Sequence, residues 1–273
     1  ALKMALQFWH NRGCPRSRIV ALRNGYHGDT FGAMAVGERG VFNGPFHGLL
    51  FAVDFVDAPY PGRELESLAQ LERLLARERP AAFIYEPLIQ GAGGMLMYEP
   101  EGLQALLALC RDKGVFCIAD EVLTGFGRSG TLFASDQMKI KPDLICLSKA
   151  LTGGFLPLGV TAASEEIYAG FFGEGRDKLL MHGHSFTGNA LSCAAAAASL
   201  ELVQHPEFNA ALHRIEAAHR RFAVRLAGHA RAASVRAKGL ILAFDVVSDE
   251  ATSYRNRLRD RLYRGFLAEG VLL

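Results

Sequence analysis

The stretch Cys146-Leu147-Ser148-Lys149-Ala150-Leu151-Thr152-Gly153-Gly154 decides how this sequence is interpreted. A short apolar run ends in Lys149, and small residues follow at once. The chain has only seven lysines, and we expect this one to emerge from a segment too apolar for the surface. A buried amine loses its charge readily because desolvation disfavours the ammonium, and a neutral amine attacks an aldehyde to form a Schiff base. A lysine that extends from a strand end into solvent explains this segment alone equally well.

Asp120 favours the reactive lysine. Residues 115–119 read as a buried apolar strand that delivers Asp120 and Glu121 at its end. A carboxylate there is costly unless a cation faces it. A protonated pyridine nitrogen is such a cation, and an aspartate beside it keeps pyridoxal phosphate a strong electron sink. Neighbouring parallel strands ending in Asp120 and Lys149 would hold opposite parts of one ring. The alternative is that the two acidic residues only cap the following turn.

Apolar runs that alternate with amphipathic helical patterns predict an α/β fold with a layered sheet. Strands are expected at residues 18–22, 82–85, 115–119, 144–147 and 159–163. Helices are expected at residues 1–11, 65–75, 103–114 and 189–203, and loops at 40–62 and 90–94. Such folds place ligands at the carboxyl ends of their strands, where Asp120 and Lys149 fall.

The sequence changes from an alanine-rich stretch to a basic amphipathic pattern near His205-Pro206, which predicts a domain boundary. Residues 1–205 form the large domain, and residues 206–273 begin a smaller C-terminal domain with a basic amphipathic helix, a strand at 240–247 and one more helix. The alanine-rich helix before the boundary is expected to pack closely against another element. The first residues already read as helix and residues 270–273 as the start of a strand, so we expect a piece of a longer protein, truncated at both ends.

Composition narrows the class of protein. Half of the 273 residues are hydrophobic, 21% are charged and the net charge is +2, so the chain can bury a full core. No block of like charge indicates nucleic acid or an anionic membrane, and the apolar runs are far too short to span a bilayer. Five cysteines without a C-x-x-C pair favour reduced thiols in the cytoplasm over disulfides or a metal site.

Three further segments could bind ligands. Tyr26 follows a strand, where its ring could stack on a flat cofactor, and His27 is more simply a hydrogen-bonded structural histidine. Residues 183–188 offer hydroxyls and free amides before a helix, which suits a phosphate or a helix-capping turn. Residues 125–130 spell a dinucleotide fingerprint, which would make the protein a nucleotide-binding oxidoreductase. We discount it because the segment does not lie directly between a strand and a helix.

Several motifs lie between residue 1 and about residue 202: Tyr26-His27-Gly28, Glu86-Pro87 with Gln90-Gly91, Asp120-Glu121-Val122 with Gly125-Phe126-Gly127-Arg128, Ser148-Lys149, and Gly188-Asn189. Together they resemble the class III pyridoxal-phosphate aminotransferases of fold type I. The resemblance implies pyridoxal 5′-phosphate as the cofactor and a three-layer large domain, with a mixed, mostly parallel sheet between helices.

The resemblance also implies roles for the matching residues. Lys149 would be the Schiff-base lysine and the proton carrier, and Asp120 would pair with the pyridine nitrogen. Val122 would pack on one face of the ring. Tyr26 would line the pocket for ring and substrate.

Three more roles follow for the segment before the alanine-rich helix. Gly183 would touch substrate, while His184 and Ser185 would reach the cofactor phosphate across a homodimer interface. Better-known members have Pro-Thr where this chain has His184-Ser185. The serine keeps the hydroxyl, so phosphate binding is expected to survive the change.

Longer strings are similar to the biotin-pathway branch of that family: residues 26–34, 90–95, 123–128, 149–154 and 181–184. This implies amino transfer from S-adenosylmethionine, or from lysine, to 8-amino-7-oxononanoate. Class III relatives that act on ornithine, 4-aminobutyrate or ω-amino acids are the alternative. The family's glycine-serine phosphate loop and its carboxylate-binding arginine would fall before residue 1 and after residue 273, so we expect this segment alone to be inactive.

Overall fold

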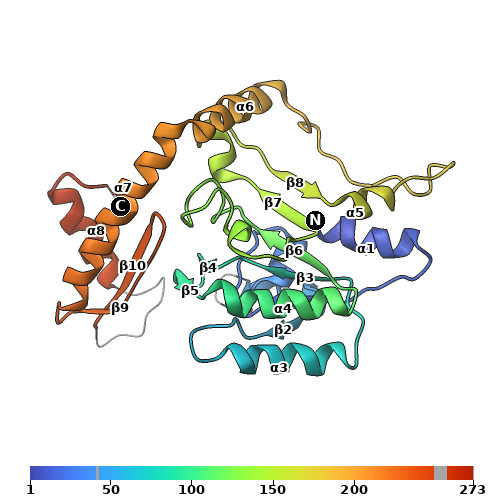
Figure 1. Cartoon of the computed structure of the whole chain (residues 1–273), viewed down its shortest axis with the longest axis horizontal. Coiled ribbons are helices and arrows are strands. Elements are labelled where there is room, and N and C mark those ends of the chain that lie inside the picture. Colours follow the sequence, from blue (N-terminus) through green and yellow to red (C-terminus); the bar gives the residue numbers. More distant parts are fainter. Residues whose placement is uncertain (41–42, 249–256, 273) are drawn as a thin grey trace.

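The computed structural model describes residues 1–40, 43–248 and 257–272. A six-stranded sheet forms its centre, in the order β2-β1-β3-β6-β7-β8 (Figure 1). Its strands are β1 Ile19–Leu22, β2 Asp54–Val56, β3 Ala82–Tyr85, β6 Phe116–Asp120, β7 Leu144–Leu147 and β8 Val160–Ala163. All neighbours pair in parallel except β8, which is antiparallel to β7. The predicted mixed, mostly parallel sheet is therefore confirmed.

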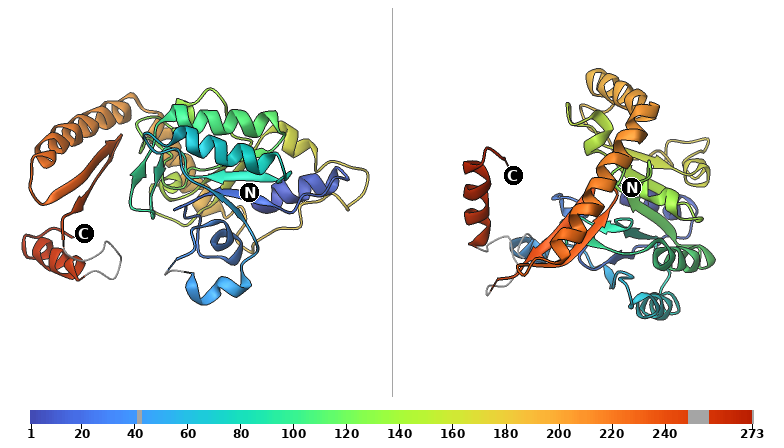
Figure 2. Two further views of the ribbon diagram at one scale, coloured as in Figure 1. Left: turned by 90° about the horizontal axis from the view of Figure 1, so that it is seen from below. Right: turned by 60° about the vertical axis from the view of Figure 1, so that its left-hand side comes forward.

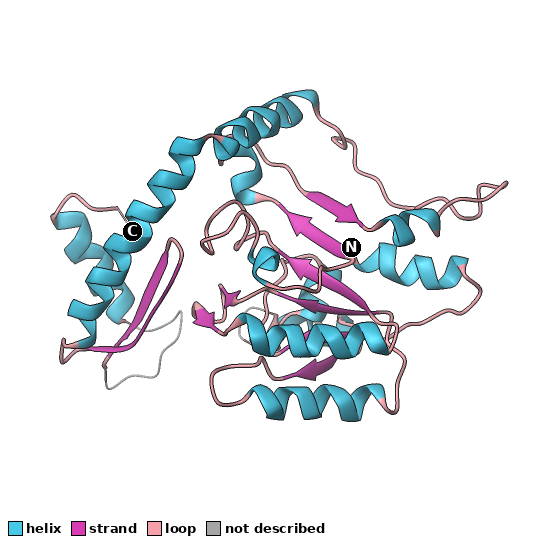
Figure 3. Ribbon diagram, viewed as in Figure 1, coloured by secondary structure: helices cyan, strands magenta, loops and turns pink. Residues whose placement is uncertain are grey.

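Helices cover both faces of this sheet, as Figure 3 shows with helices in cyan and strands in magenta. Side chains of a strand alternate between the faces, so in β3 Phe83 and Tyr85 enter one apolar cluster and Ala82 and Ile84 the other. The first cluster includes side chains of α3 and α4, and the second those of α1 and α5. The helices are α1 Leu2–Asn11, α2 Phe31–Val36, α3 Glu64–Leu75, α4 Pro100–Asp112 and α5 Glu165–Ala169.

Helix α4 shows how local sequence sets these elements. Pro100 occupies the first turn, where a missing N–H costs nothing. Leu103, Leu106, Leu107 and Cys110 recur at helical spacing and are all buried. The chain leaves the helix at Gly114 with φ +62°, a left-handed conformation that glycine adopts without penalty. The strand β6 follows at once and ends on Asp120.

Three short strands lie where the sequence predicted none. Edge strand β2 and the 3-10 turn η1 (Gly44–Leu49) fall in the predicted loop 40–62, because three residues are too few to show a period. β4 Ile89–Gln90 pairs with β5 Leu96–Met97, so the predicted loop 90–94 is mainly a tight turn between two strands. Gln90 is fully buried.

The C-terminal part stands to one side of the sheet (Figure 2). Helix α6, Ala190–Gln204, and helix α7, Pro206–Ala227, meet at His205, which ends one helix and precedes the other. Strands β9 Ala232–Lys238 and β10 Ile241–Val246 form an antiparallel hairpin, and α8 spans Leu258–Ala268. The sequence predicted β10 but not β9, because Arg236 and Lys238 interrupt the apolar pattern that would have indicated a strand. The predicted strand at 270–273 shows no strand in its described residues, and residue 273 lies outside them.

Within the part of the chain that the structure describes, helices are either too short or too polar to cross a membrane.

Candidate active site

A pocket of about 410 Å³ opens at the carboxyl ends of the parallel strands. Its lining includes Tyr26, His27, Glu86, Asp120, Val122 and Lys149. Strands β6 and β7 are neighbours, and Asp120 lies opposite Cys146 in their register. Lys149, three residues further along, therefore reaches the same pocket. The predicted meeting of Asp120 and Lys149, with Tyr26 and Val122 beside them, is what the structure shows.

Asp120 holds a buried carboxylate at the end of β6, with 7% of the residue exposed. Its Oδ2 lies 2.7 Å from Nδ1 of His27, and its Oδ1 accepts a hydrogen bond of 3.1 Å from the backbone N–H of Val122. Of the two oxygens of Asp120, only Oδ1 therefore caps the following turn, as the alternative interpretation predicts. The other oxygen, Oδ2, contacts His27 instead. A carboxylate accepts, so the His27 Nδ1 carries the proton in this contact.

Neighbouring Glu121 has a structural task. It is fully buried and turned away from the pocket lining, and its carboxylate accepts from the Thr124 hydroxyl and from the backbone N–H groups of Ala134 and Ser135. Three donors on one buried carboxylate fix the turn after β6. The two adjacent acids thus divide the roles between the pocket and the fold.

Glu86 is a second buried carboxylate in the pocket, at the end of β3. Its oxygens accept from the backbone N–H groups of Tyr26 and Gly91, each at 3.0 Å. Burial raises the pKa of the Glu86 carboxyl above its usual range, although His27 and the two N–H groups pull it down. The sequence placed Glu86 in a motif without a role. Its position at a strand end, the same as that of Asp120, was the available signal.

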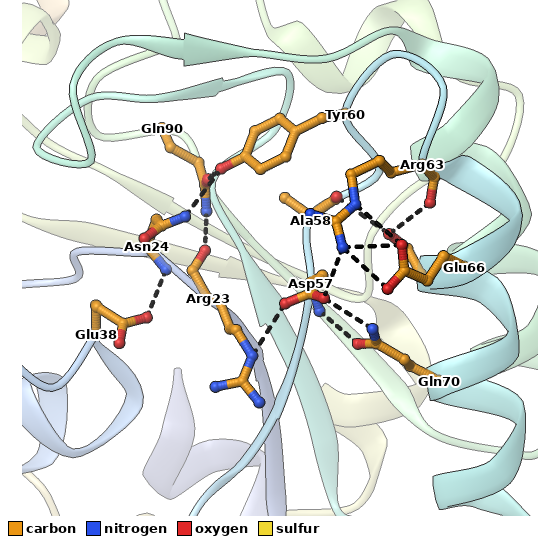
Figure 4. A network of polar contacts seen from close by, with 11 residues as sticks. Arg23, Asn24, Glu38, Asp57, Ala58, Tyr60, Arg63, Glu66, Gln70 and Gln90 are labelled. Carbon is orange, nitrogen blue, oxygen red and sulfur yellow. Dashed lines mark hydrogen bonds and ion pairs between the residues drawn. The ribbon is translucent and has the colours of Figure 1, made fainter.

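The two residues that precede the turn to Tyr26, Arg23 and Asn24, belong to the polar network in Figure 4. The fully buried Gln90 donates from Nε2 to the carbonyl of Arg23 at 2.7 Å, and its Oε1 accepts from the Tyr60 hydroxyl. Asn24 donates from its side chain to that hydroxyl at 3.3 Å. These bonds join the segments after β1, β2 and β3 beside the pocket.

Replacing Gln90 with leucine should lower the free energy of unfolding by about 1–3 kcal/mol, because the carbonyl of Arg23 loses its buried donor. Gln70→Leu is the matched control: Gln70 also makes two hydrogen bonds, both to Asp57, but is only partly buried. Urea unfolding measures both. Equal losses for the two variants would contradict a special role for Gln90.

Lys149 is exposed in the single chain, so the prediction that this chain buries its amine is wrong. Strand β7 is next to the edge of the sheet, and three of the four residues of edge strand β8 are exposed. Helix α6 packs on the turn that begins at Lys149, where Ala196 joins the cluster of Leu151 and Phe126, but this packing leaves the Lys149 side chain exposed. The backbone of Lys149 has φ +44°, which is unfavourable for a residue with a Cβ and often marks a functional site.

Gly183, His184 and Ser185 lie outside the Lys149 pocket and are exposed. His184 instead lines a second hollow of about 790 Å³, together with residues 156–159 and 186–189. The helix that follows residues 183–188 is capped by the next residue, Asn189, whose side chain accepts from the N–H of Ser192. The roles predicted for residues 183–185 depend on a second subunit and stay predictions.

The glycine-rich segment 125–130 has no dinucleotide-binding context. Turns follow β6, and the next regular element is the short 3-10 turn η2, Ala134–Gln137. A Cβ on Gly127 would come within 2.8 Å of Leu212, and one on Gly239 within 2.4 Å of the Gly130 nitrogen. The small residues thus allow α7 and the β9–β10 hairpin to pack closely against this loop.

The pocket suits an aromatic aldehyde with a basic ring nitrogen. It offers the carboxylate of Asp120, the amine of Lys149 and a wall that includes Tyr26 and Val122. Asp120 could face a protonated ring nitrogen, and Lys149 lies where a carbonyl carbon of the same ligand could be attacked. Both side chains come from adjacent strands, so one small ring could contact both. These residues therefore fit pyridoxal phosphate.

Known proteins match along the whole chain. The family model for class III aminotransferases matches residues 1–273. Adenosylmethionine-8-amino-7-oxononanoate aminotransferase of Synechococcus elongatus is 50% identical, over 100% of this chain and 66% of its own length. The enzyme of the same name from Geobacter sulfurreducens is 40% identical, over 92% of this chain and 59% of its own length.

Solved structures agree with this match. The Methanocaldococcus jannaschii enzyme with that name superimposes with a TM-score of 0.91 at 34% identity, over 99% of this chain and 64% of its own. A PLP-bound amine transaminase from an uncultivated Pseudomonas species superimposes with a TM-score of 0.90 at 34% identity. The match covers 99% of this chain and 66% of that one. The chain thus spans roughly two thirds or less of the length of these four relatives. On the family match, the identities and the shared fold, the chain belongs to the class III aminotransferases.

Proposed function

We propose that this chain is the cofactor-binding part of an aminotransferase of biotin synthesis. The reaction moves an amino group from S-adenosylmethionine, or from lysine, to 8-amino-7-oxononanoate and gives 7,8-diaminononanoate. The observation that carries the proposal is the pairing of Asp120 and Lys149 across one pocket, in a chain up to 50% identical to enzymes named for this reaction.

Pyridoxal phosphate would be held by four residues of this chain: Tyr26, Asp120, Val122 and Lys149. The cofactor, when bound, supplies an aldehyde that bonds reversibly to amines and a ring that stabilises negative charge on the adjacent carbon. Asp120 would keep a proton on the ring nitrogen, with its carboxylate oriented by His27 and by the N–H of Val122. Val122 and Tyr26 would limit the movement of the ring.

Lys149 has two tasks in this proposal. Its Nζ would attach the cofactor between reactions, and once displaced by the amino donor it would move a proton to and from the reacting carbon. Its exposure in the single chain means that a second subunit would have to cover it to keep water away. His184 and Ser185 of that subunit would then reach the cofactor phosphate.

Helix α6 supports the homodimer. Ser192, Ala196 and Ser199 face inward, and Ser199 donates to the carbonyl of Ala150 beside Lys149. The opposite face, with Ala194, Ala197, Ala198 and Leu202, is exposed, as are Phe155 (86%) and Leu191 (72%). So much apolar surface around one alanine-rich helix is typical of a subunit interface.

Replacing Ala197 with arginine should therefore convert a dimer to monomers, because the new charge would be buried in an apolar contact. We expect the dissociation constant to rise by about 100-fold or more, as a few kcal/mol imply. Ala218→Arg, on the exposed surface of α7, is the control with the same change of side chain. Sedimentation of the native protein measures both; a dimer equally stable in the two variants would exclude α6 from the interface.

A growth experiment tests the substrate. A biotin auxotroph that lacks this aminotransferase should grow without biotin when it carries the native gene, and should fail with Lys149→Ala. Failure of the native gene, combined with turnover of ornithine, 4-aminobutyrate or an ω-amino acid by the purified protein, would move the chain to another class III activity. Similarity to an amine transaminase of known structure makes that the second candidate.

A further inference from the structure

One wall of the candidate pocket is an unusual turn between β4 and β5. Gly91, Ala92 and Met95 line the pocket there. Gly94 has φ +103° and Met95 has φ +52°, and the latter is unfavourable for a residue with a Cβ. Such a conformation persists only where its surroundings enforce it, and it is found most often at functional sites. The N–H groups of Gly94 and Met95 both donate to the carbonyl of Gly91, within the turn itself.

The outward carbonyls of this turn are bound by Arg236, from strand β9. Its Nε donates to the carbonyl of Met95 at 2.8 Å, and its Nη2 donates to the carbonyl of Gly94 at 2.5 Å. The guanidinium is fixed from its other side by the carbonyl of Ser234 at 2.6 Å and by Oδ1 of Asp245 at 3.1 Å. All three nitrogens are used, and the side chain is only 17% exposed.

These bonds join segments about 140 residues apart in the sequence. Lys238, two residues along the same strand, pairs with Glu99 at 3.0 Å. The N–H of Leu240 donates to the carbonyl of Arg128 at 2.9 Å. Docking of the hairpin therefore has other anchors, and Arg236 is the anchor that acts directly on the turn lining the pocket.

We propose that Arg236 is a positioning residue for substrate binding. By holding the carbonyls of Gly94 and Met95 it fixes the left-handed turn, and with it the Met95 wall against which the substrate must fit. The planar fork of an arginine can hold two adjacent carbonyls at once, which a lysine ammonium cannot do with the same geometry. This role rests on the proposed function, since it assumes that substrate enters the pocket of Lys149.

Hydrogen exchange and kinetics of the native protein test this role together. In Arg236→Ala, amides 92–97 should exchange about 10-fold faster or more, and the KM for the amino acceptor should rise by a similar factor while kcat changes less, because two charged hydrogen bonds are lost. Arg236→Lys should fall between this variant and the wild type. Lys238→Ala, which removes the neighbouring ion pair on the same strand, should leave both quantities near the wild-type values.

The outcomes separate the two proposals. Exchange and KM that are the same in Arg236→Ala and Lys238→Ala would overturn the positioning role and leave Arg236 as one more docking contact. If Arg236→Ala does not fold, the same comparison is made with Arg236→Lys, and identity with Lys238→Ala has the same meaning. A wild-type protein that transfers no amino group would refute the proposed function, while the exchange comparison would still decide whether Arg236 holds the turn.

Discussion

Lys149→Ala should reduce transamination by at least about 10²–10⁴-fold, the range that general acid–base catalysis alone contributes. Lys149 is the lysine among the residues lining the Asp120 pocket, and both proposed tasks, cofactor attachment and proton movement, need its amine. The purified variant should also lose the visible absorption of lysine-bound pyridoxal phosphate. Steady-state kinetics and an absorption spectrum measure the two effects.

Lys141→Ala is the control for this experiment. Lys141 is exposed, lies outside the pocket and pairs at 3.7 Å with Asp136. Its loss should leave rate and spectrum unchanged, because an exposed ion pair contributes little. If Lys149→Ala kept the visible band and its activity, another lysine would hold the cofactor and the assignment of this pocket would be wrong.

Asp120→Asn should lower kcat by about 10²–10³-fold, the effect of removing one preorganised electrostatic contact from an active site. The amide keeps the shape of the side chain but loses the charge that would face a protonated ring nitrogen. Folding should suffer less than in a site of fixed donors, because the other tautomer of His27 lets Nδ1 accept from the new amide while the amide oxygen still accepts from the N–H of Val122. The cofactor should also dissociate more readily, which equilibrium dialysis with pyridoxal phosphate measures.

The adjacent acid provides the contrast. Glu121→Gln places an amide N–H₂ among donors from Thr124, Ala134 and Ser135, so the free energy of unfolding should fall by about 1–3 kcal/mol. Its kcat should change less than that of Asp120→Asn, because Glu121 is not among the residues lining the pocket. A reversed pattern, in which Glu121→Gln impairs catalysis and Asp120→Asn impairs folding, would refute the division of roles.

The meeting of Asp120 and Lys149 was predictable because parallel strands end at one edge of a sheet. Each apolar run was long enough to be recognised, and neighbouring runs in the chain became neighbouring strands. Edge strand β2 was not predicted, since three residues show no period and gain their structure from pairing with β1. Strand β9 was missed because charged residues interrupt it.

Other features of the site depend on contacts that no local pattern records. His27 reaches Asp120 across 93 residues, and Arg236 reaches the turn at Met95 across 141. Nothing in the sequence around His27 or Arg236 predicts which distant residue each one contacts. The burial of Lys149 was predicted wrongly for a related reason. Apolar residues beside a lysine indicate that this part of the surface is covered, but the covering segment need not belong to the same chain.

The most direct test of the central claim is to find which lysine takes the cofactor. The native protein is incubated with pyridoxal phosphate, reduced with borohydride, and digested for peptide mass mapping. The account predicts the phosphopyridoxyl mass on the peptide that contains Lys149, and its loss from that peptide in Lys149→Ala. Stable labelling of a different lysine at equal yield, with Lys149 unmodified, would contradict it.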